Sequence, residues 1–166
     1  MPKPLSVPAD GNLLVLWVPA IANPATPTVA ELTAGTVVDL TCYIRLGGYN
    51  PSVSEDTVDD KRLCDTENYS QPGRITRSLE ITYNTNILSA VNDKAALALT
   101  ERAVGNIVER WGVPYDQVVA VADKVNVLPV TCGAQRDLPP EENGKLGITQ
   151  SLSPRDKYYR RVAVIA

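Results

Sequence analysis

The sequence of 166 residues contains no histidine and no phenylalanine, and both absences restrict what the protein can be. Histidine is the commonest general base and the commonest metal ligand, so a serine or cysteine nucleophile here has no imidazole to activate it. The three cysteines are widely spaced and form no C-x-x-C pair, which leaves zinc without a recognisable ligand set. Without phenylalanine, the aromatic part of a core must come from Trp17, Trp111 and the tyrosines.

The motifs of other chemistries are missing as well. The sequence has no glycine-rich phosphate loop, and it lacks the twelve-residue calcium loop with its central glycine. Two carboxylate pairs occur, Asp59-Asp60 and Glu141-Glu142, but both lie beside turn residues, where solvated loop charges are the better interpretation. We therefore expect no catalytic residues, no metal site, no cofactor and no enzymatic activity. We also expect thiols rather than disulfides, with a Cys64–Cys132 or Cys42–Cys132 bridge as the alternative.

The charge balance argues against a dedicated nucleic-acid binder. Sixteen basic residues stand against 19 acidic ones, a net charge of −3, with no long run of one sign. The basic and aromatic cluster Lys157–Arg161 fits a sheet edge or a subunit contact better than a nucleic-acid site. The longest apolar run, Leu13–Ile21, is broken by Pro19, so we expect no membrane span. The start Met1-Pro2-Lys3-Pro4 does not resemble a secretory leader, and we expect the chain to stay in the cytoplasm where it is made.

Thirteen prolines and ten glycines divide the chain into short segments rich in Val, Ile, Thr and Tyr, which favours a single mainly β domain over residues 1–166. The clearest alternation runs from Ile75 to Tyr83, and Arg77 occupies its apolar row, where it needs a partner or an interface. Strands are predicted over residues 13–18, 36–44, 75–83, 106–111, 124–130, 144–152 and 161–166.

One principal helix is predicted from Asp93 to Ala103, because this segment is rich in Ala and Leu and its apolar residues recur at helical spacing. Val29–Leu32 is predicted to form a single helical turn. Residues 45–73 show no sustained periodicity, and we expect a long loop there, which is either disordered or functional.

Several segments, in their order along the chain, resemble the major tail proteins (tail tube proteins) of siphophages that infect actinobacteria. Those segments are Pro4–Asn12, Val15–Pro19, Pro27–Gly35, Asp39–Tyr43, Asp60–Cys64, Gln71–Arg74, Arg110–Val113 and Val130–Gly133. The resemblance implies a β-sandwich or barrel-like domain flanked by one helix. It further implies hexameric rings with a continuous inner β-barrel, stacked into a tube through which DNA passes. The family has no catalytic residues to carry over.

From this resemblance we expect a virion protein of the phage tail, assembled in the host cytoplasm. Its partners would be further copies of itself, a tape measure protein in the lumen, and the tail tip and tail terminator proteins. Phage DNA would pass without specific binding, which an acidic conduit favours. The alternatives are a head–tail connector or tail terminator ring subunit, and a monomeric β-sandwich binding module.

Two sets of residues are candidates for the assembly itself. The N-terminal arm, residues 1–11, and the expected loop, residues 45–73, are suited to inter-ring contact. The contact candidates are Pro4, Val7, Tyr49, Asp56, Asp59, Asp60, Arg62, Tyr69, Arg74 and Arg77. The polar face of the strand over residues 75–83 is the candidate lining of the lumen: Thr76, Ser78, Glu80 and Thr82.

Overall fold

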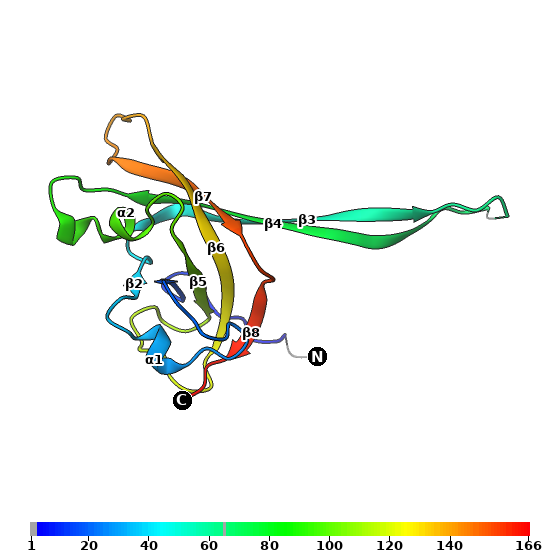
Figure 1. Ribbon diagram of the computed structural model, residues 1–166, viewed down its shortest axis with the longest axis horizontal. Coiled ribbons are helices and arrows are strands. Elements are labelled where there is room, and N and C mark those ends of the chain that lie inside the picture. The colour runs from blue at the N-terminus through cyan, green and yellow to red at the C-terminus, as the bar shows by residue number, and fades with distance from the viewer. Residues whose placement is uncertain (1–2, 65) are drawn as a thin grey trace.

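The fold is built on one antiparallel sheet of eight strands, which curls on itself like part of a barrel (Figure 1). The computed structural model describes residues 3–64 and 66–166. The strands are β1 (Leu13–Val18), β2 (Val38–Asp39), β3 (Ile44–Asp60), β4 (Tyr69–Asn84), β5 (Val104–Trp111), β6 (Lys124–Asp137), β7 (Gly147–Pro154) and β8 (Tyr159–Ala163). Their order is β2-β1-β5-β6-β7-β4-β3, and β8 pairs with the beginning of β6. The mainly β, barrel-like fold predicted from the sequence is confirmed.

Both faces of the central strands are buried, which explains why β1 is apolar at every position. One core lies inside the curl and is closed by α2 (Lys94–Ala98) together with Leu99. The other lies on the opposite face, beneath α1 (Val29–Leu32) and the loop that carries Val119. The first contains Val15, Trp17, Leu79, Ile81, Tyr83, Ile107 and Leu128, and the second Leu14, Leu16, Val18, Val108, Val125 and Val127.

The two α-helices are short, and only one has the extent that the sequence predicts. The α1 turn begins with a capping box, in which Glu31 N–H donates to Thr28 Oγ1 at 3.2 Å and Thr28 N–H donates to Glu31 at 2.9 Å. The predicted helix 93–103 is wrong in length, because α2 ends at Ala98. The chain that follows α2 joins the sheet instead of extending the helix. Arg102 N–H donates to the Cys132 carbonyl, and Cys132 N–H donates to the Ala103 carbonyl.

The strand predicted over residues 36–44 is largely wrong, because only Val38 and Asp39 pair with β1. The side chain of Asp39 accepts the Thr41 N–H at 2.8 Å, and Tyr43 and Ile44 both donate to the Leu40 carbonyl, so the backbone turns here. Cys42 is exposed and Cys132 is buried, and no disulfide joins the two. Within residues 3–64 and 66–166, no helix is long and apolar enough to cross a membrane.

The predicted loop over residues 45–73 is also wrong as secondary structure. It is most of a long hairpin, in which β3 and β4 pair from Ile44 and Tyr83 out to Asp60 and Tyr69. The outer half of this hairpin extends far beyond the curled body (Figure 1). The segment 51–60 is rich in Ser, Asp and Glu and lacks alternation because no core covers its faces. The alternation that predicts a strand lies on the partner strand β4, between Ile75 and Tyr83.

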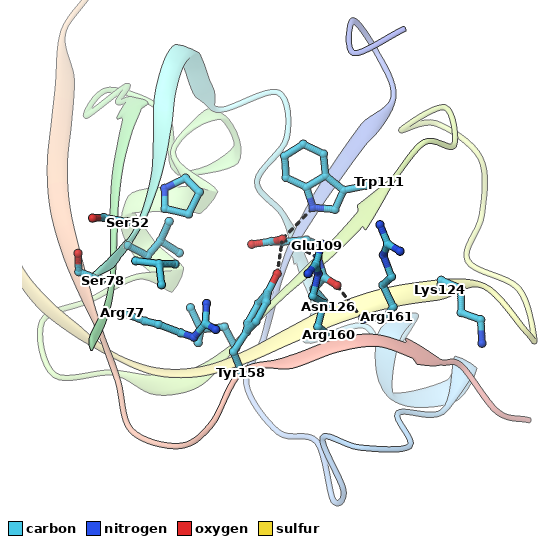
Figure 2. A pocket seen from close by; sticks show the side chains of 14 residues that line it. Ser52, Arg77, Ser78, Glu109, Trp111, Lys124, Asn126, Tyr158, Arg160 and Arg161 are labelled. Carbon is cyan, nitrogen blue, oxygen red and sulfur yellow. Dashed lines mark hydrogen bonds between the residues drawn. The ribbon is translucent and has the colours of Figure 1, made fainter. Parts of the chain in front are cut away.

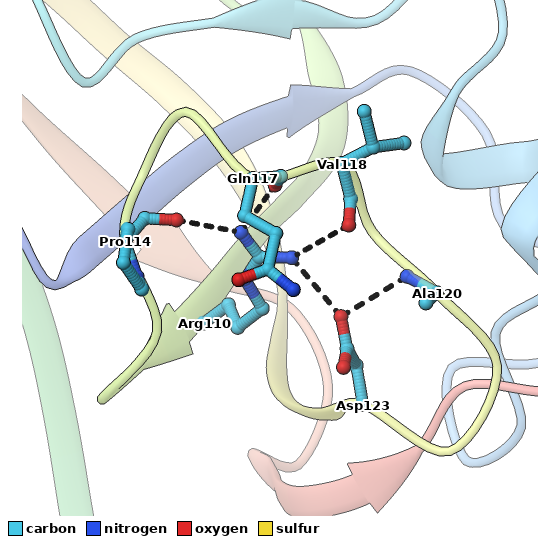
Figure 3. Close-up of polar contacts among 6 residues, drawn as sticks. All are labelled: Arg110, Pro114, Gln117, Val118, Ala120 and Asp123. Carbon is cyan, nitrogen blue, oxygen red and sulfur yellow. Dashed lines mark hydrogen bonds and ion pairs between the residues drawn. The ribbon is translucent and has the colours of Figure 1, made fainter.

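Arg110 holds the long loop between β5 and β6 against the sheet (Figure 3). Its guanidinium is 1% exposed and donates to the carbonyls of Pro114 at 3.0 Å, Val118 at 3.3 Å and Gln117. It also forms an ion pair with Asp123 at 3.0 Å. Asp123 in turn accepts the Ala120 N–H at 3.0 Å, so this one ion pair fixes both ends of the loop.

We expect Arg110→Ala to lower the free energy of unfolding by about 3–5 kcal/mol, because it leaves a half-buried carboxylate and three carbonyls without their donor. Urea unfolding at neutral pH measures this loss. Arg74→Ala, on the exposed hairpin, is the matched control and should change stability by less than about 0.5 kcal/mol. Equal stability of the two variants would contradict the role given to Arg110.

Candidate assembly surfaces

One face of the sheet is exposed over most of its extent and consists mainly of short polar side chains; of these, Thr149 is buried. In an antiparallel pair, directly opposed residues share a face, and the register places Ser52 opposite Ser78, Asn50 opposite Glu80, and Glu80 opposite Ser151. We call this surface the hydroxyl face. Its members are Asn50, Ser52, Ser54, Thr76, Ser78, Glu80, Thr82, Thr131, Arg136, Thr149, Ser151 and Ser153.

All four lumen candidates from the sequence, Thr76, Ser78, Glu80 and Thr82, lie on the hydroxyl face. It spans β3, β4, β7 and β6, and Thr82 Oγ1 donates across two of these strands to Thr149 Oγ1 at 3.2 Å. Two charged residues belong to it, Glu80 on β4 and Arg136 on β6. The face is therefore smooth, wettable and poor in charge, which makes it unsuited to tight binding of a phosphate backbone.

The projecting part of the β3–β4 hairpin exposes apolar side chains on both of its faces. The register places Val53 opposite Arg77 and Ile75 opposite Glu55 on the face that continues from the core. Beyond them β4 has one residue more than β3, so Val58 and Tyr69 lie on the other face. Val53, Val58, Tyr69 and Ile75 are each between 50% and 57% exposed, and exposed apolar side chains on an isolated hairpin indicate that another molecule covers it.

The base of the hairpin is held by the carboxylate of Glu109 on β5, which Figure 2 shows with Trp111, Asn126 and Tyr158. Glu109 is 5% exposed and accepts from Trp111 Nε1 at 2.8 Å, Asn126 Nδ2 at 3.1 Å and the Tyr158 hydroxyl at 3.3 Å. The hydroxyl of Tyr49, on β3, donates to its other oxygen. One carboxylate thus links the hairpin, β5, β6 and the segment before β8.

Burial, and then the Glu109 carboxylate, raise the pKa of Tyr49, and the same two causes raise the pKa of Tyr158 to about 12. Both hydroxyls therefore stay protonated as donors at neutral pH. Arg77 lies with its guanidinium 5.0 Å from the centre of the Tyr158 ring. The need of Arg77 for a partner, predicted from its place in an apolar row, is met by this ring.

Beside Glu109 is a cavity of about 850 Å³ whose rim carries four cations, Arg77, Lys124, Arg160 and Arg161. None of the four forms an ion pair within the described part of the chain. Arg161 has a left-handed backbone, with φ of 53°, at an irregularity where β8 pairs with β6. Its N–H donates to Asn126 Oδ1 at 2.8 Å, which holds this bulge in place.

The structure separates the contact candidates into three places. Pro4 and Val7 are exposed in the N-terminal segment; Met1 and Pro2 of the predicted arm lie outside the described residues. Tyr49 and Arg77 contact Glu109 and Tyr158 within the subunit. The other six candidates are on the projecting hairpin: Asp56, Asp59, Asp60, Arg62, Tyr69 and Arg74. Asp59 and Asp60 pair with Lys61 and Arg62.

Sequence reasoning missed Glu109, Asn126 and Tyr158. A signal for Glu109 exists, since it alternates with Ile107 and Trp111 in a strand and so occupies an apolar row, as Arg77 does. A carboxylate in such a row needs donors. Nothing in the sequence indicates that those donors come from four separate segments.

We expect Glu109→Gln to lower the free energy of unfolding by about 2–3 kcal/mol, because an amide presents N–H groups to at least one of the four donors that a carboxylate accepts. Tyr158→Phe, which removes one donor and leaves three, is the matched control and should cost about 1 kcal/mol. Urea unfolding measures the free energy of unfolding of both variants. A Glu109→Gln protein as stable as the wild type would show that the carboxylate is dispensable.

The comparisons with known proteins agree with this geometry. The family model described as phage tail tube protein matches residues 1–166. Among solved structures, the chain is similar to one in a cryo-EM structure of the anti-feeding prophage (AFP) baseplate, 6-fold symmetrised. The identity is 13%, the TM-score is 0.56, and the match covers 94% of this chain and 95% of the other. No curated protein matches the chain.

The two findings have different weight. At 13% identity the baseplate protein shows a shared fold and nothing more. The family match extends over the whole chain, and the family is a structural one, not a class of enzymes. The chain belongs to the phage tail tube protein family.

Proposed function

We propose that the protein forms homohexameric rings that stack into the tail tube of a siphophage of actinobacteria, with the hydroxyl face lining the bore. The observation that supports this proposal is the four-stranded surface of β3, β4, β7 and β6, which is largely exposed and consists mostly of Ser, Thr and Asn. A bore lined in this way is hydrated and binds DNA only weakly, because it presents few fixed charges to the phosphates.

The sheet also has the edges that a ring requires. β3 is the last strand of the sheet on one side, and its outer edge is unpaired within the described residues. Exposed edges of long strands tend to pair with another chain, and closure into a ring removes them. A continuous inner barrel formed by neighbouring copies follows from this edge. Sixfold symmetry rests on the resemblance to tail proteins and is supported by the symmetry stated for the baseplate structure.

The other partners follow from the same proposal. A tape measure protein occupies the bore before DNA does, and tail tip and tail terminator proteins cover the two ends of the tube. The protein is then a virion component of the tail, assembled in the host cytoplasm. The projecting hairpin and the N-terminal residues make the inter-ring contacts.

Negative-stain electron microscopy of the concentrated protein tests the tube directly. We expect hollow tubes of stacked rings. Replacing residues 55–75 by Asn-Gly joins Ser54 to Thr76, which are directly opposed, through a two-residue turn. This variant should fold, because the core begins at Leu79, and it should stop at single rings or subunits. Tubes of normal length from the shortened hairpin would contradict inter-ring contact, and wild-type rings that never stack would favour a connector or terminator.

The lining of the bore is tested by charge. Glu80 is exposed at the centre of the hydroxyl face. We expect Glu80→Lys to leave tubes intact and to slow DNA ejection from reconstituted phage several-fold, because six added cations per ring attract phosphate. Glu101→Lys, which is exposed and outside the hydroxyl face, is the control. Ejection rates unchanged by Glu80→Lys would remove this face from the bore.

A further inference from the structure

The cavity of about 850 Å³ beside Glu109 has an excess of positive charge (Figure 2). We call it the basic cavity. Its rim carries Arg77, Lys124, Arg160 and Arg161, and none of them forms an ion pair within residues 3–64 and 66–166. The one carboxylate in its described lining is that of Glu109, which already accepts from four donors. Four cations around one space repel one another, so the cavity favours an anionic occupant.

The lining of the basic cavity is apolar as well as basic. Leu79 and Leu128 contribute to it, and so does Trp111, whose side chain is 53% exposed. A surface that complements this lining presents carboxylates and apolar side chains together.

The four cations are not part of the proposed bore. Arg77 belongs to the row of β4 that continues into the core, whereas the alternate residues Thr76 and Glu80 belong to the hydroxyl face. The other three cations are at the beginning of β6 and on β8, outside the four-stranded surface. DNA in the bore would not meet them, which favours a protein surface as the occupant.

The outer part of the hairpin carries the opposite charge. Residues 55–67 contain six acidic and two basic residues, a net charge of −4, in a chain whose total is −3. The rest of the chain therefore has a small positive charge, and the two signs are segregated along the molecule. Segregated charge of this kind steers unlike surfaces of two copies toward each other.

One face of the outer hairpin combines carboxylates with apolar side chains. The extra residue at the irregularity is on β4, so β3 keeps its alternation and Asp56, Val58 and Asp60 share a face. Tyr69 joins them because it is directly opposite Asp60. We call these four residues the acidic hairpin face. Val58 and Tyr69 are each 57% exposed, and Asp56 forms no ion pair in the described part of the chain. Asp60 pairs only with the exposed Arg62, and such a pair contributes little.

The hairpin cannot reach the basic cavity of its own subunit. Its strands stay paired out to Asp60 and Tyr69, and it projects away from the body (Figure 1). Ten residues of extended chain beyond Ser54 span roughly 33 Å, which is enough to lie across part of a neighbouring copy. A contact between two different surfaces is head-to-tail, and its repetition produces an open, growing assembly.

We propose that the acidic hairpin face of one copy occupies the basic cavity of a copy in the next ring. This assignment rests on the proposed function and names both surfaces of the inter-ring contact. Asp56 and Asp60 meet the cations of the rim, and Val58 and Tyr69 are removed from water against Trp111.

Charge reversal on the hairpin tests one side of this contact. Asp56→Lys/Asp60→Lys alters the acidic hairpin face. Glu55→Lys/Asp59→Lys makes the same change in net charge on the opposite face of the same strand and is the control. We expect the first variant to raise the critical concentration for tube formation at least about tenfold, and the control to raise it far less. Equal effects of the two variants would overturn the assignment of this face.

Charge reversal in the basic cavity tests the other side. Lys124→Glu/Arg160→Glu should raise the critical concentration by a similar factor, because carboxylates would then face carboxylates. Lys94→Glu/Arg155→Glu, which changes the net charge equally outside the cavity, is the control and should assemble as the wild type does. All four side chains are exposed, so both proteins should fold with wild-type circular dichroism. Normal tubes from the cavity variant would overturn the pairing and leave the tube itself standing.

The variant that combines both reversals gives the decisive readout. Asp56→Lys/Asp60→Lys/Lys124→Glu/Arg160→Glu keeps the net charge of the wild type and should recover most of the lost assembly, because the attraction is restored in reverse. Losses that simply add would show that the two surfaces do not meet. A wild-type protein that remains monomeric overturns the proposed function and the pairing with it.

Nucleic acid is the alternative occupant, and the cavity variant detects it as well. Wild-type protein and Lys124→Glu/Arg160→Glu are titrated into short labelled duplex DNA, with binding followed by fluorescence anisotropy. We expect no difference between them. If the wild type binds the duplex, the variant does not, and tubes of the variant form normally, the cavity is a phosphate site and the pairing is overturned.

Discussion

The Glu109 carboxylate is the interaction on which the geometry of the whole subunit depends. It accepts hydrogen bonds from the hairpin, from its own strand, from β6 and from the segment before β8, beside a cavity of about 850 Å³. The strength of the four hydrogen bonds to this buried acceptor depends on their angles, whereas the strength of an apolar contact does not depend on direction. The angle at which the hairpin leaves the body is therefore fixed by hydrogen-bond geometry, and any surface on the hairpin is presented at a defined distance and direction.

The curled sheet divides its surfaces by the alternation of its strands. In β4, Leu79, Ile81 and Tyr83 fill the core while Ser78, Glu80 and Thr82 form the hydroxyl face on the other side. A one-residue shift of register would exchange the two sets, so the core enforces the polarity of the outer face. In the proposed tube this coupling matters, because the face proposed to line the bore is specified by the same packing that keeps the subunit folded.

The sequence predicts those parts of the fold in which burial is periodic. The sequence predicts β1 residue for residue, because both its faces are buried, and it predicts the inner half of β4 from its alternation. It predicts a loop for all of β3 beyond Ile44, because Ser54, Asp56 and Asp59 are outside the core and follow no alternation. Thr36–Ile44 was predicted as a strand from composition alone, although Asp39 and Leu40 begin a turn. Arg77 could be identified as needing a partner, but Tyr158 could not, because that contact joins segments some eighty residues apart.

The hairpin shows how one alternation can serve two environments. From Tyr83 out to Ile75, every second residue of β4 belongs to one face, but the body ends near Leu79, and Ile75 continues the apolar row into solvent. A two-stranded hairpin without cover is marginally stable in water. Its outer half therefore contributes little to the stability of a lone subunit. In the proposed tube another copy covers it, and the order of the hairpin then depends on protein concentration.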